Sequence, residues 1–329
     1  MPRGQQAATA PEQAAEATRE AYRDALVKIM KSDELVYCLD SDTGLFTGVD
    51  FGCASGRYLN LGIAEQNLMG VAAGLDARGK YPFVNTMAAF ASTRALEAVK
   101  IDIAYNRLPV RIVATHAGLS AGHLGPTHHG LEDLACLRTL PHMTVVVPVD
   151  AAQTRAVIRQ SRLVKGPLYV RLGRKATPPV APAQSVAIGT VQWLRQGDDA
   201  VALACGPHPV MAALTAHEAL RERGIGLAVA NVHTIKPLDR AAIVAAARGR
   251  VVVTVEDHWI TGGLGGAVAE LLSEACPTWV RRIGVPDTFA SAAGPHEWLL
   301  EHYGITGDGV TQTVLAVLAE QRGVHAEAR

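Results

Sequence analysis

The sequence Asn60-Leu-Gly-Ile-Ala-Glu65-Gln-Asn67 joins two apolar segments. It is the reference point for assigning the strands and helices on either side of it. Tyr58 to Leu61, at its start, has the composition of a buried strand. Leu68 to Arg78, after it, has that of a helix of small and apolar residues. Taking a carboxylate out of water is costly unless a partner uses the charge. Glu65 at this junction is therefore a candidate functional residue, although the helix dipole also favours an acidic residue in a first turn.

Strand-like and helix-like segments alternate on both sides of this junction. Such alternation predicts an α/β fold, with a mostly parallel sheet covered by helices on both faces. The strands expected in the first half of the chain are Leu35–Leu39, Tyr58–Leu61, Tyr81–Thr86, Val110–Thr115, Thr144–Pro148 and Leu168–Leu172. The expected helices are Glu12–Lys31, Leu68–Arg78, Ala89–Tyr105, Leu131–Leu140 and one that Asp150 caps and that runs to Val164.

A Pro-rich segment, Thr177-Pro-Pro-Val-Ala-Pro-Ala-Gln184, separates this series from a second, smaller α/β series. We therefore expect two domains, at residues 20–176 and 187–325, joined by a linker at residues 177–186. Residues 1–19 are rich in Ala, Gln, Thr and Glu and lack the apolar core of a signal peptide, so we expect a flexible tail. The strands of the second domain are expected near Ala200–Leu203, Leu227–Val232, Val251–Val255 and Val280–Ile283.

The composition excludes several classes of function. The chain has 31 Lys and Arg residues and 31 Asp and Glu residues, which argues against a general binder of nucleic acid or of membrane surfaces. Only 19% of the residues are charged and 49% are hydrophobic, which indicates an oligomer that buries further surface. The five cysteines show no CxxC spacing, so we expect neither disulfides nor a zinc site, and a cytoplasmic setting. No apolar run is long enough to predict a membrane span.

Ligands of parallel sheets bind at the carboxyl ends of the strands. The loop at Asp42, Glu65, the segment after Thr86 and a Gly/His-rich loop at residues 116–130 all follow expected strands. We therefore expect these segments to gather at one edge of the first sheet.

Three motifs in this order give the chain a resemblance to a known family: Leu61-Gly-Ile-Ala-Glu65-Gln66, Thr115-His116 and Gly125-Pro126-Thr127-His128. With them the chain resembles the transketolase family over roughly residues 20 to 325, in its pyrimidine-binding and C-terminal domains. The resemblance implies thiamine diphosphate and Mg²⁺, and the transfer of a two-carbon ketol unit from a ketose donor to an aldehyde. In the family, the glutamate at the position of Glu65 binds the aminopyrimidine ring and activates the cofactor.

The resemblance also implies further cofactor contacts. Phe90 would stack on the pyrimidine, and Met87 and Ile63 would lie beside the cofactor. Asp42 matches an aspartate that approaches the cofactor across a subunit interface. From their residue types alone, Phe90 could equally belong to the core and Asp42 could equally form a turn.

His116 and His128 match positions that contact substrate oxygens, and an imidazole can donate a hydrogen bond or move a proton near neutral pH. Arg174 matches a position that binds a sugar phosphate, and Arg171 lies at the same strand end, where a guanidinium can hold a phosphate. A solvated charge is the alternative for both arginines. His123 and His129 lie near the two loop histidines, which leaves a metal site open although the usual zinc spacing is absent.

Two departures from the family concern the substrate. His123 and Leu124 stand where relatives carry an acidic pair, and Phe46 stands near a serine that relatives use for the phosphate. Leucine cannot accept a hydrogen bond from a sugar hydroxyl, and leaving that group unpaired costs about 1–3 kcal/mol. We therefore expect an altered acceptor, such as a non-phosphorylated or less polar aldehyde, or the thiol of an acyl carrier.

The remaining departure is a missing half-site. In the family a separate domain with a Gly-Asp-Gly…Asn motif holds the diphosphate and Mg²⁺, whereas the Gly307-Asp308-Gly309 of this chain lies too near its end and is expected to form a turn. The glycine-rich Thr261–Gly266 segment lacks the P-loop lysine and is expected to serve helix packing. The chain therefore resembles the second subunit of a split transketolase, in an α2β2 assembly with a companion subunit that carries the motif and the metal.

Two other functions remain open from the sequence. One is the β subunit of a 2-oxoacid dehydrogenase E1-type enzyme, which would pass an acyl group to a lipoyl or carrier-protein thiol. The two-histidine loop resembles transketolase more closely. The other is a structural subunit without catalysis, which Glu65, Phe90, His116 and His128 together argue against.

Overall fold

Two β-sheets organise the chain, which a computed structural model describes over residues 15–180 and 186–327. The strands of the larger sheet are β2 (Val36–Asp40), β3 (Tyr58–Asn60), β4 (Tyr81–Met87), β5 (Arg111–Thr115), β6 (Thr144–Val146), β7 (Leu168–Arg171) and β12 (Thr234–Lys236). They lie in the order β12-β6-β7-β5-β4-β2-β3, and every pairing except that of β12 is parallel.

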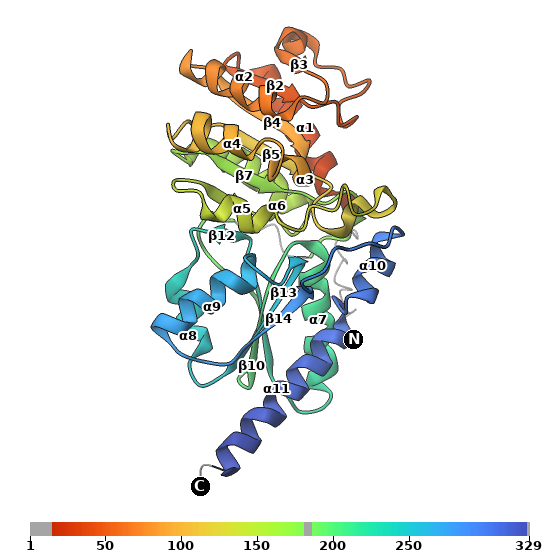
Figure 1. Ribbon diagram of the computed structural model, residues 1–329, viewed down its shortest axis with the longest axis vertical. Coiled ribbons are helices and arrows are strands. Elements are labelled where there is room, and N and C mark those ends of the chain that lie inside the picture. Colours follow the sequence, from red (N-terminus) through yellow and green to blue (C-terminus); the bar gives the residue numbers. More distant parts are fainter. Residues whose placement is uncertain (1–14, 181–185, 328–329) are drawn as a thin grey trace, which may run out of the picture.

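The smaller sheet lies below the larger one in Figure 1. Its order is β14-β13-β10-β11-β9, with only the edge strand β9 antiparallel. Its strands are β9 (Gln192–Arg195), β10 (Ala200–Cys205), β11 (Leu227–Asn231), β13 (Val251–Trp259) and β14 (Val280–Val285). The predicted fold, two α/β domains with mostly parallel sheets, is therefore confirmed.

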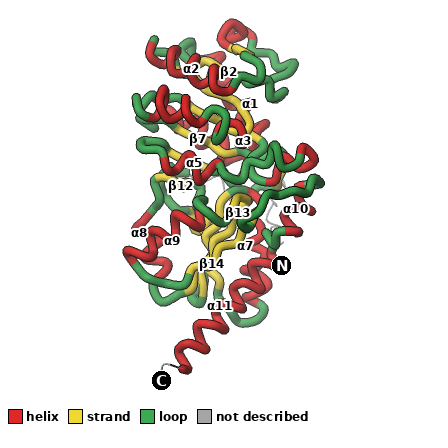
Figure 2. The backbone as a smooth tube through the Cα atoms, viewed as in Figure 1, coloured by secondary structure: helices red, strands yellow, loops and turns green. Residues whose placement is uncertain are grey.

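Helices surround both sheets (Figure 2). Those of the first domain are α1 (Thr18–Ser32), η1 (Gly52–Arg57), α2 (Glu65–Ala77), α3 (Ala88–Ala91), α4 (Leu96–Ala98), η2 (Val99–Ala104), η3 (Leu119–Leu124), α5 (Asp133–Thr139), α6 (Ala151–Gln160) and η4 (Ser161–Leu163). Those of the second are α7 (Pro207–Arg221), α8 (Arg240–Ala247), α9 (Leu264–Ala275), α10 (His296–His302) and α11 (Gly307–Glu327). Asp150 caps α6 as predicted, because its side chain accepts a hydrogen bond from the Gln153 amide at 2.8 Å.

The single helix predicted over Ala89–Tyr105 is wrong. Instead, α3 ends after one turn, and the chain continues as α4 and as the π-helix η2. Hydroxyl groups contribute to the break: Ser92 Oγ donates to the Ala88 carbonyl at 2.8 Å, and Thr93 Oγ1 donates to the Ala89 carbonyl at 2.6 Å. Side chains that bond the backbone in this way compete with a regular helix.

The predicted 1–19 tail and 177–186 linker also need adjustment where the structure describes them. Glu16–Ala17 form β1, which pairs with β8 (Ala176–Thr177), and α1 already begins at Thr18. The parts of both predictions at residues 1–14 and 181–185 lie outside the described residues. The predicted turn at Gly307–Gly309 is instead the first turn of α11.

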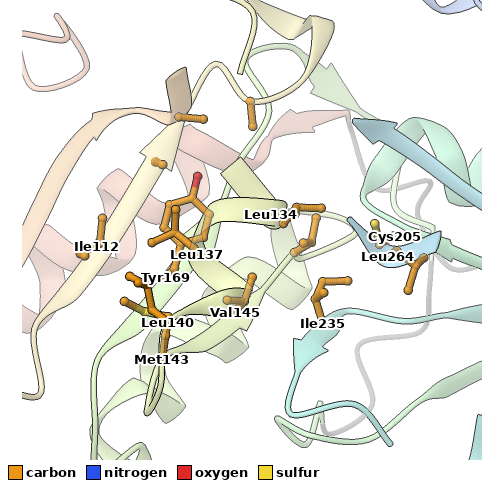
Figure 3. Close-up of a cluster of buried hydrophobic side chains, with 14 of the residues drawn as sticks. Ile112, Leu134, Leu137, Leu140, Met143, Val145, Tyr169, Cys205, Ile235 and Leu264 are labelled. Carbon is orange, nitrogen blue, oxygen red and sulfur yellow. The ribbon is translucent and has the colours of Figure 1, made fainter. Parts of the chain in front are cut away.

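An apolar core runs through the domain boundary. Figure 3 shows Leu134, Leu137 and Tyr169 of the first domain in the same buried cluster as Cys205 and Leu264 of the second. In addition, β12 comes from the second half of the chain but pairs with β6 of the first sheet. Such continuous burial fixes the two domains against each other.

Within its described residues the structure has no helix long and apolar enough to cross a bilayer. The five cysteines, Cys38, Cys53, Cys136, Cys205 and Cys276, are all free thiols.

Candidate active site

The carboxyl ends of β2, β3, β4, β5 and β7 meet at one edge of the larger sheet. Asp40 is in register with Asn60 on one side and Asn85 on the other, Met87 with Thr115, and Ala114 with Arg171. The segments that carry the predicted site residues therefore follow neighbouring strands, as expected from the alternating pattern.

Glu65 is the first residue of α2, and its side chain is 2% exposed. Arg94, between α3 and α4, donates a hydrogen bond from Nη1 to Glu65 Oε2 at 2.7 Å. Among the described residues nothing donates to the other oxygen, Oε1. The buried carboxylate is thus held on one side by a charged partner and is available on the other. Sequence reasoning found Glu65 but missed Arg94, which lay inside a predicted continuous helix.

Glu65 and Arg94 line an open depression of about 680 Å³ between α2 and the π-helix η2. Glu97, Ile101 and Asp102 lie on the same wall, and 72% of the nearby Ile63 is exposed. π-Helical segments occur frequently at functional sites. The carboxylate therefore faces a space large enough for part of a ligand or of another chain.

Phe90 connects the Glu65 pair to the histidine loop. The Arg94 guanidinium carbon lies 4.7 Å from the centre of the Phe90 ring, and the His128 ring packs edge-on against Phe90 at 5.3 Å. Phe90 and Met87 are both partly exposed rather than part of the closed core. Glu65, Phe90 and His128 thus belong to one continuous group of side chains.

His116 follows β5 in a left-handed conformation, with φ of +57°. Such backbone strain in a non-glycine residue is uncommon and is concentrated at functional sites. His116 is 5% exposed, and its Nδ1 lies 3.0 Å from Thr115 Oγ1. Burial lowers the pKa of His116 to about 4, with further contributions from Arg19, Arg174 and His128. At neutral pH the ring is therefore uncharged, so that it can donate from one nitrogen and accept at the other.

Arg19 is a further candidate site residue, which sequence reasoning missed. The Gly173 amide donates to Thr18 Oγ1 at 3.1 Å, which ties the start of α1 to the segment that carries Arg174. Arg19 Nε is buried without a hydrogen-bond partner, and burial followed by the charge of Arg174 lowers the Arg19 pKa. No carboxylate of the described residues forms an ion pair with Arg19 or Arg174.

Arg171 differs from its predicted place in a substrate site. Its side chain is buried, and Nε donates to Asp133 Oδ2 at 2.8 Å. Nη2 donates to the carbonyls of Gly130 and Asp257, at 3.0 and 2.9 Å. These bonds commit the guanidinium to the protein interior, because a buried arginine is stable only when paired.

The other predicted residues lie apart from this group. Asp42 is exposed in a left-handed conformation and accepts a hydrogen bond from Asn60 Nδ2 at 2.9 Å. His123 and Leu124 are exposed on the loop. Phe46 is buried in an aromatic cluster with Tyr22, Phe51 and Tyr58. Among the described residues, no group of three His, Cys, Asp or Glu side chains is placed to hold a metal ion.

The glycine-rich segment at Thr261–Gly266 binds a side chain of the protein itself, that of Glu256. Glu256 is fully buried, and its carboxylate accepts hydrogen bonds from the Leu264 and Gly265 amides at 2.7 and 2.8 Å. A Cβ on Gly263 would lie 2.0 Å from this carboxylate. The carboxyl group of Glu256 already occupies the start of α9, so the glycines serve close packing, as expected, and not a phosphate.

The neutral state of His116 has a consequence for acid stability. Its pKa of about 4 lies below the unfolded value of about 6.5, so that below pH 6.5 the unfolded chain binds the proton more readily. The folded state therefore loses stability as the pH falls through this window. Between pH 7 and pH 5, we expect the unfolding free energy of the wild type to fall by about 2 kcal/mol more than that of His116→Gln.

The measurement is chemical denaturation at the two pH values, compared with His302→Gln at an exposed position. The decisive quantity is the difference in pH dependence between variants. Burial raises the pKa values of Glu132 and Glu256, so these two residues add stability as the pH falls, and they do so equally in every variant. An equal pH dependence in His116→Gln and the wild type would contradict the assignment.

Comparison with known proteins adds independent evidence. Residues 14–179 match the family described as "Transketolase, pyrimidine binding domain", and residues 189–310 match "Transketolase, C-terminal domain". The chain is 39% identical to the "6-deoxy-6-sulfo-D-fructose transketolase subunit SqwH" of Clostridium sp. (strain MSTE9) over 298 residues, which cover 89% of this chain and 92% of that protein.

Another relative and a solved structure match the chain over a similar length. The chain is 39% identical to an apulose-4-phosphate transketolase subunit of Phocaeicola vulgatus, covering 91% of this chain and 96% of that one. A solved structure described as "Split gene transketolase, inactive beta4 tetramer" superimposes with a TM-score of 0.84 at 43% identity, covering 92% of this chain and 98% of that chain.

Proposed function

This chain belongs to the transketolase family, and from that premise we propose that it is the second subunit of a split transketolase. It would transfer a two-carbon ketol unit only together with a companion subunit. The observation that carries the proposal is the continuous group of Glu65, Phe90 and His128 at the carboxyl edge of the sheet, with Glu65 Oε1 unpaired among the described residues.

The family depends on thiamine diphosphate, and the residues of this chain fit one half of that cofactor. A buried carboxylate with a free oxygen and a partly exposed aromatic ring suit an aminopyrimidine, which offers N–H groups and a flat apolar face. When bound, the cofactor supplies an activated carbon that accepts the ketol unit. We propose that Glu65, Phe90, Met87, Ile63 and Asp42 face the cofactor, and that the companion subunit holds its diphosphate and Mg²⁺.

In this arrangement each side chain has a distinct task. Arg94 fixes Glu65 Oε2, which leaves Oε1 to hold or exchange a proton with the pyrimidine ring. His116, neutral near pH 7, can donate to a substrate oxygen or take a proton from it. His128, held against Phe90, can do the same from the opposite part of the loop.

The substrate is expected to be an anionic sugar. Arg19 and Arg174 place two guanidinium groups near His116 without a carboxylate partner in the described residues, an arrangement that favours a phosphate or sulfonate. The names of the two relatives are consistent with this, because a sulfo-sugar and a sugar phosphate both carry an anionic group. His123 and Leu124 would then tune the recognition of sugar hydroxyls rather than of the anion.

A donor screen of the reconstituted pair tests this function. We expect turnover of a ketose phosphate or sulfonate, weak turnover of an uncharged ketose, and none of 2-oxo acids. Replacing both Arg19 and Arg174 with Met should raise KM for the anionic ketose by about 10²–10⁴-fold, since each of the two charge-assisted contacts contributes about 1.5–3 kcal/mol. KM for the uncharged ketose should barely change.

Lys175→Met is the matched control, because Lys175 follows Arg174 directly but donates its Nζ to Glu297. It should leave both KM values near those of the wild type. Turnover of 2-oxo acids in place of ketoses would instead favour an E1-type β subunit. An equal effect of the double substitution on charged and uncharged donors would reject the anion site.

A further inference from the structure

The loop that carries His116 and His128 is held from the second domain. The Leu119 amide, three residues after His116, donates to Asp257 Oδ1 at 2.9 Å. Asp257 lies on β13, the strand next to the edge of the second sheet. In Figure 1, α10 of the second domain lies beside the loop that follows β5. A contact between residues 138 positions apart therefore joins the second domain to the candidate active site.

Asp257 is itself fixed from two sides. His296 of α10 lies with Nε2 3.0 Å from Asp257 Oδ2, a hydrogen bond between two side chains that are almost fully buried. Burial alone would raise the Asp257 pKa, but His296 and Arg171 outweigh it and lower the pKa. Asp257 therefore stays ionised, which strengthens its hydrogen bond from the Leu119 amide.

Gly118 shows how closely the aspartate approaches the loop. Its φ is +62°, and a Cβ built on it would lie 2.3 Å from Asp257 Oδ2 and 2.6 Å from the Asp257 carbonyl oxygen. Only glycine combines this backbone conformation with such a close approach. The loop conformation and the aspartate thus depend on each other.

The far end of the loop joins the same network. The Gly118 amide donates to the Gly130 carbonyl at 2.9 Å, which closes the loop at its base. Arg171 then donates to the Gly130 and Asp257 carbonyls and pairs with Asp133. Both ends of the segment between His116 and Gly130 are therefore tied to Asp257, directly or through Arg171.

We propose that Asp257 is a positioning residue that holds the loop so that His116 and His128 meet the substrate in the right geometry. The inference rests on the proposed function. It gives the second domain, which carries none of the candidate site residues predicted from the sequence, a defined part in the reaction. The cofactor side of the site, at Glu65 and Phe90, lies on other segments and meets this loop through the contact of Phe90 with His128.

Kinetics of the assembled enzyme test the proposal. We expect Asp257→Ala to lower kcat/KM for the ketose donor by about 10–100-fold, because small displacements of substrate-positioning groups have effects of this size. The thiamine diphosphate concentration required for half-maximal activity should change much less than kcat/KM, because Glu65 and Phe90 lie on other segments. Asp257→Asn keeps an oxygen that can accept from the Leu119 amide, so it should restore most of the activity. His296→Ala, which leaves the Leu119 contact in place, should have an intermediate effect.

Amide hydrogen exchange supplies a readout that does not require activity. Asp257→Ala should speed exchange in the peptide that contains Leu119, and Asp257→Asn should not. Asp287→Ala, at an exposed position of the second domain, should change neither exchange nor kinetics. Unchanged exchange in Asp257→Ala overturns the proposal, and so does faster exchange with unaltered kcat/KM. A wild-type pair without ketol transfer would reject the proposed function instead, while the exchange result would still decide whether Asp257 holds the loop.

Discussion

Replacing Glu65 with alanine is expected to lower ketol transfer by the reconstituted enzyme by about 10²–10⁴-fold, the range that a positioned proton-transfer group contributes. The carboxylate is almost fully buried and keeps Oε1 free, whereas Glu97 of the same depression is exposed and lies on α4. The rate of ketol transfer under saturating cofactor and donor is the measurement.

A loss of this size must be separated from a loss of folding. Arg94 would be left without its partner, but 48% of its side chain is exposed, so its charge can be solvated at little cost. We therefore expect the unfolding midpoint of Glu65→Ala to remain close to that of the wild type. Glu97→Gln, which changes an exposed acid in the same depression, is the matched control and should retain full activity. A Glu65→Ala enzyme within tenfold of the wild-type rate would show that the carboxylate does not handle the proton.

Glu65 was predictable because a local pattern exposed it: an acidic residue stood where strand and helix both required apolar neighbours. It was also predictable, for a similar reason, that the segments with Asp42, Met87 and His116 follow neighbouring strands. The alternation of strands and helices sets a parallel sheet, and the carboxyl ends of neighbouring parallel strands meet at one edge.

Other parts of the candidate site depend on long-range contacts, which produce no recognisable pattern in the local sequence. Arg19 stood where the expected tail and the expected helix Glu12–Lys31 overlap, with no motif to mark it, and the contact of Thr18 with Gly173, 155 residues away, ties this segment to the one that carries Arg174. Arg171 and Arg174 look alike in the sequence, yet Asp133 draws Arg171 into the interior and leaves Arg174 beside the site. Arg94 reaches Glu65 because the predicted helix is broken between α3 and α4.

The expectations about the substrate likewise depended partly on local sequence and partly on long-range contacts. The sequence drew attention to missing polar groups at Leu124 and Phe46 and therefore favoured a less polar acceptor. The structure places Phe46 in the core, where it closes an aromatic cluster, and brings Arg19 to the site instead. The specificity that we propose for this chain thus rests on which charges the fold assembles, and a single departure from a family motif is weak evidence about the whole substrate.

We also expect the chain without its companion to show no ketol transfer and to bind thiamine diphosphate at least about 10³-fold more weakly than the assembled pair. Several charge-assisted contacts to the diphosphate would be missing, and each contributes about 1.5–3 kcal/mol. Titration calorimetry of the chain alone and of the pair, each with Mg²⁺, provides the comparison. The relative described as an inactive β4 tetramer of a split-gene transketolase is consistent with this expectation.

The expectation follows from how this chain uses its own anion-binding elements. The glycine-rich start of α9 is closed by Glu256, and Gly307-Asp308-Gly309 begins α11, where Gly307 packs against Thr215 and Gly309 against the Gly304 carbonyl. The described residues offer no acidic cluster for Mg²⁺. Arg19 and Arg174 could bind a free diphosphate, so Arg19→Met/Arg174→Met is the control for binding in the wrong place. Equally tight binding of the cofactor by the isolated chain and by the pair, persisting in that control, would show that the diphosphate site lies on this subunit after all.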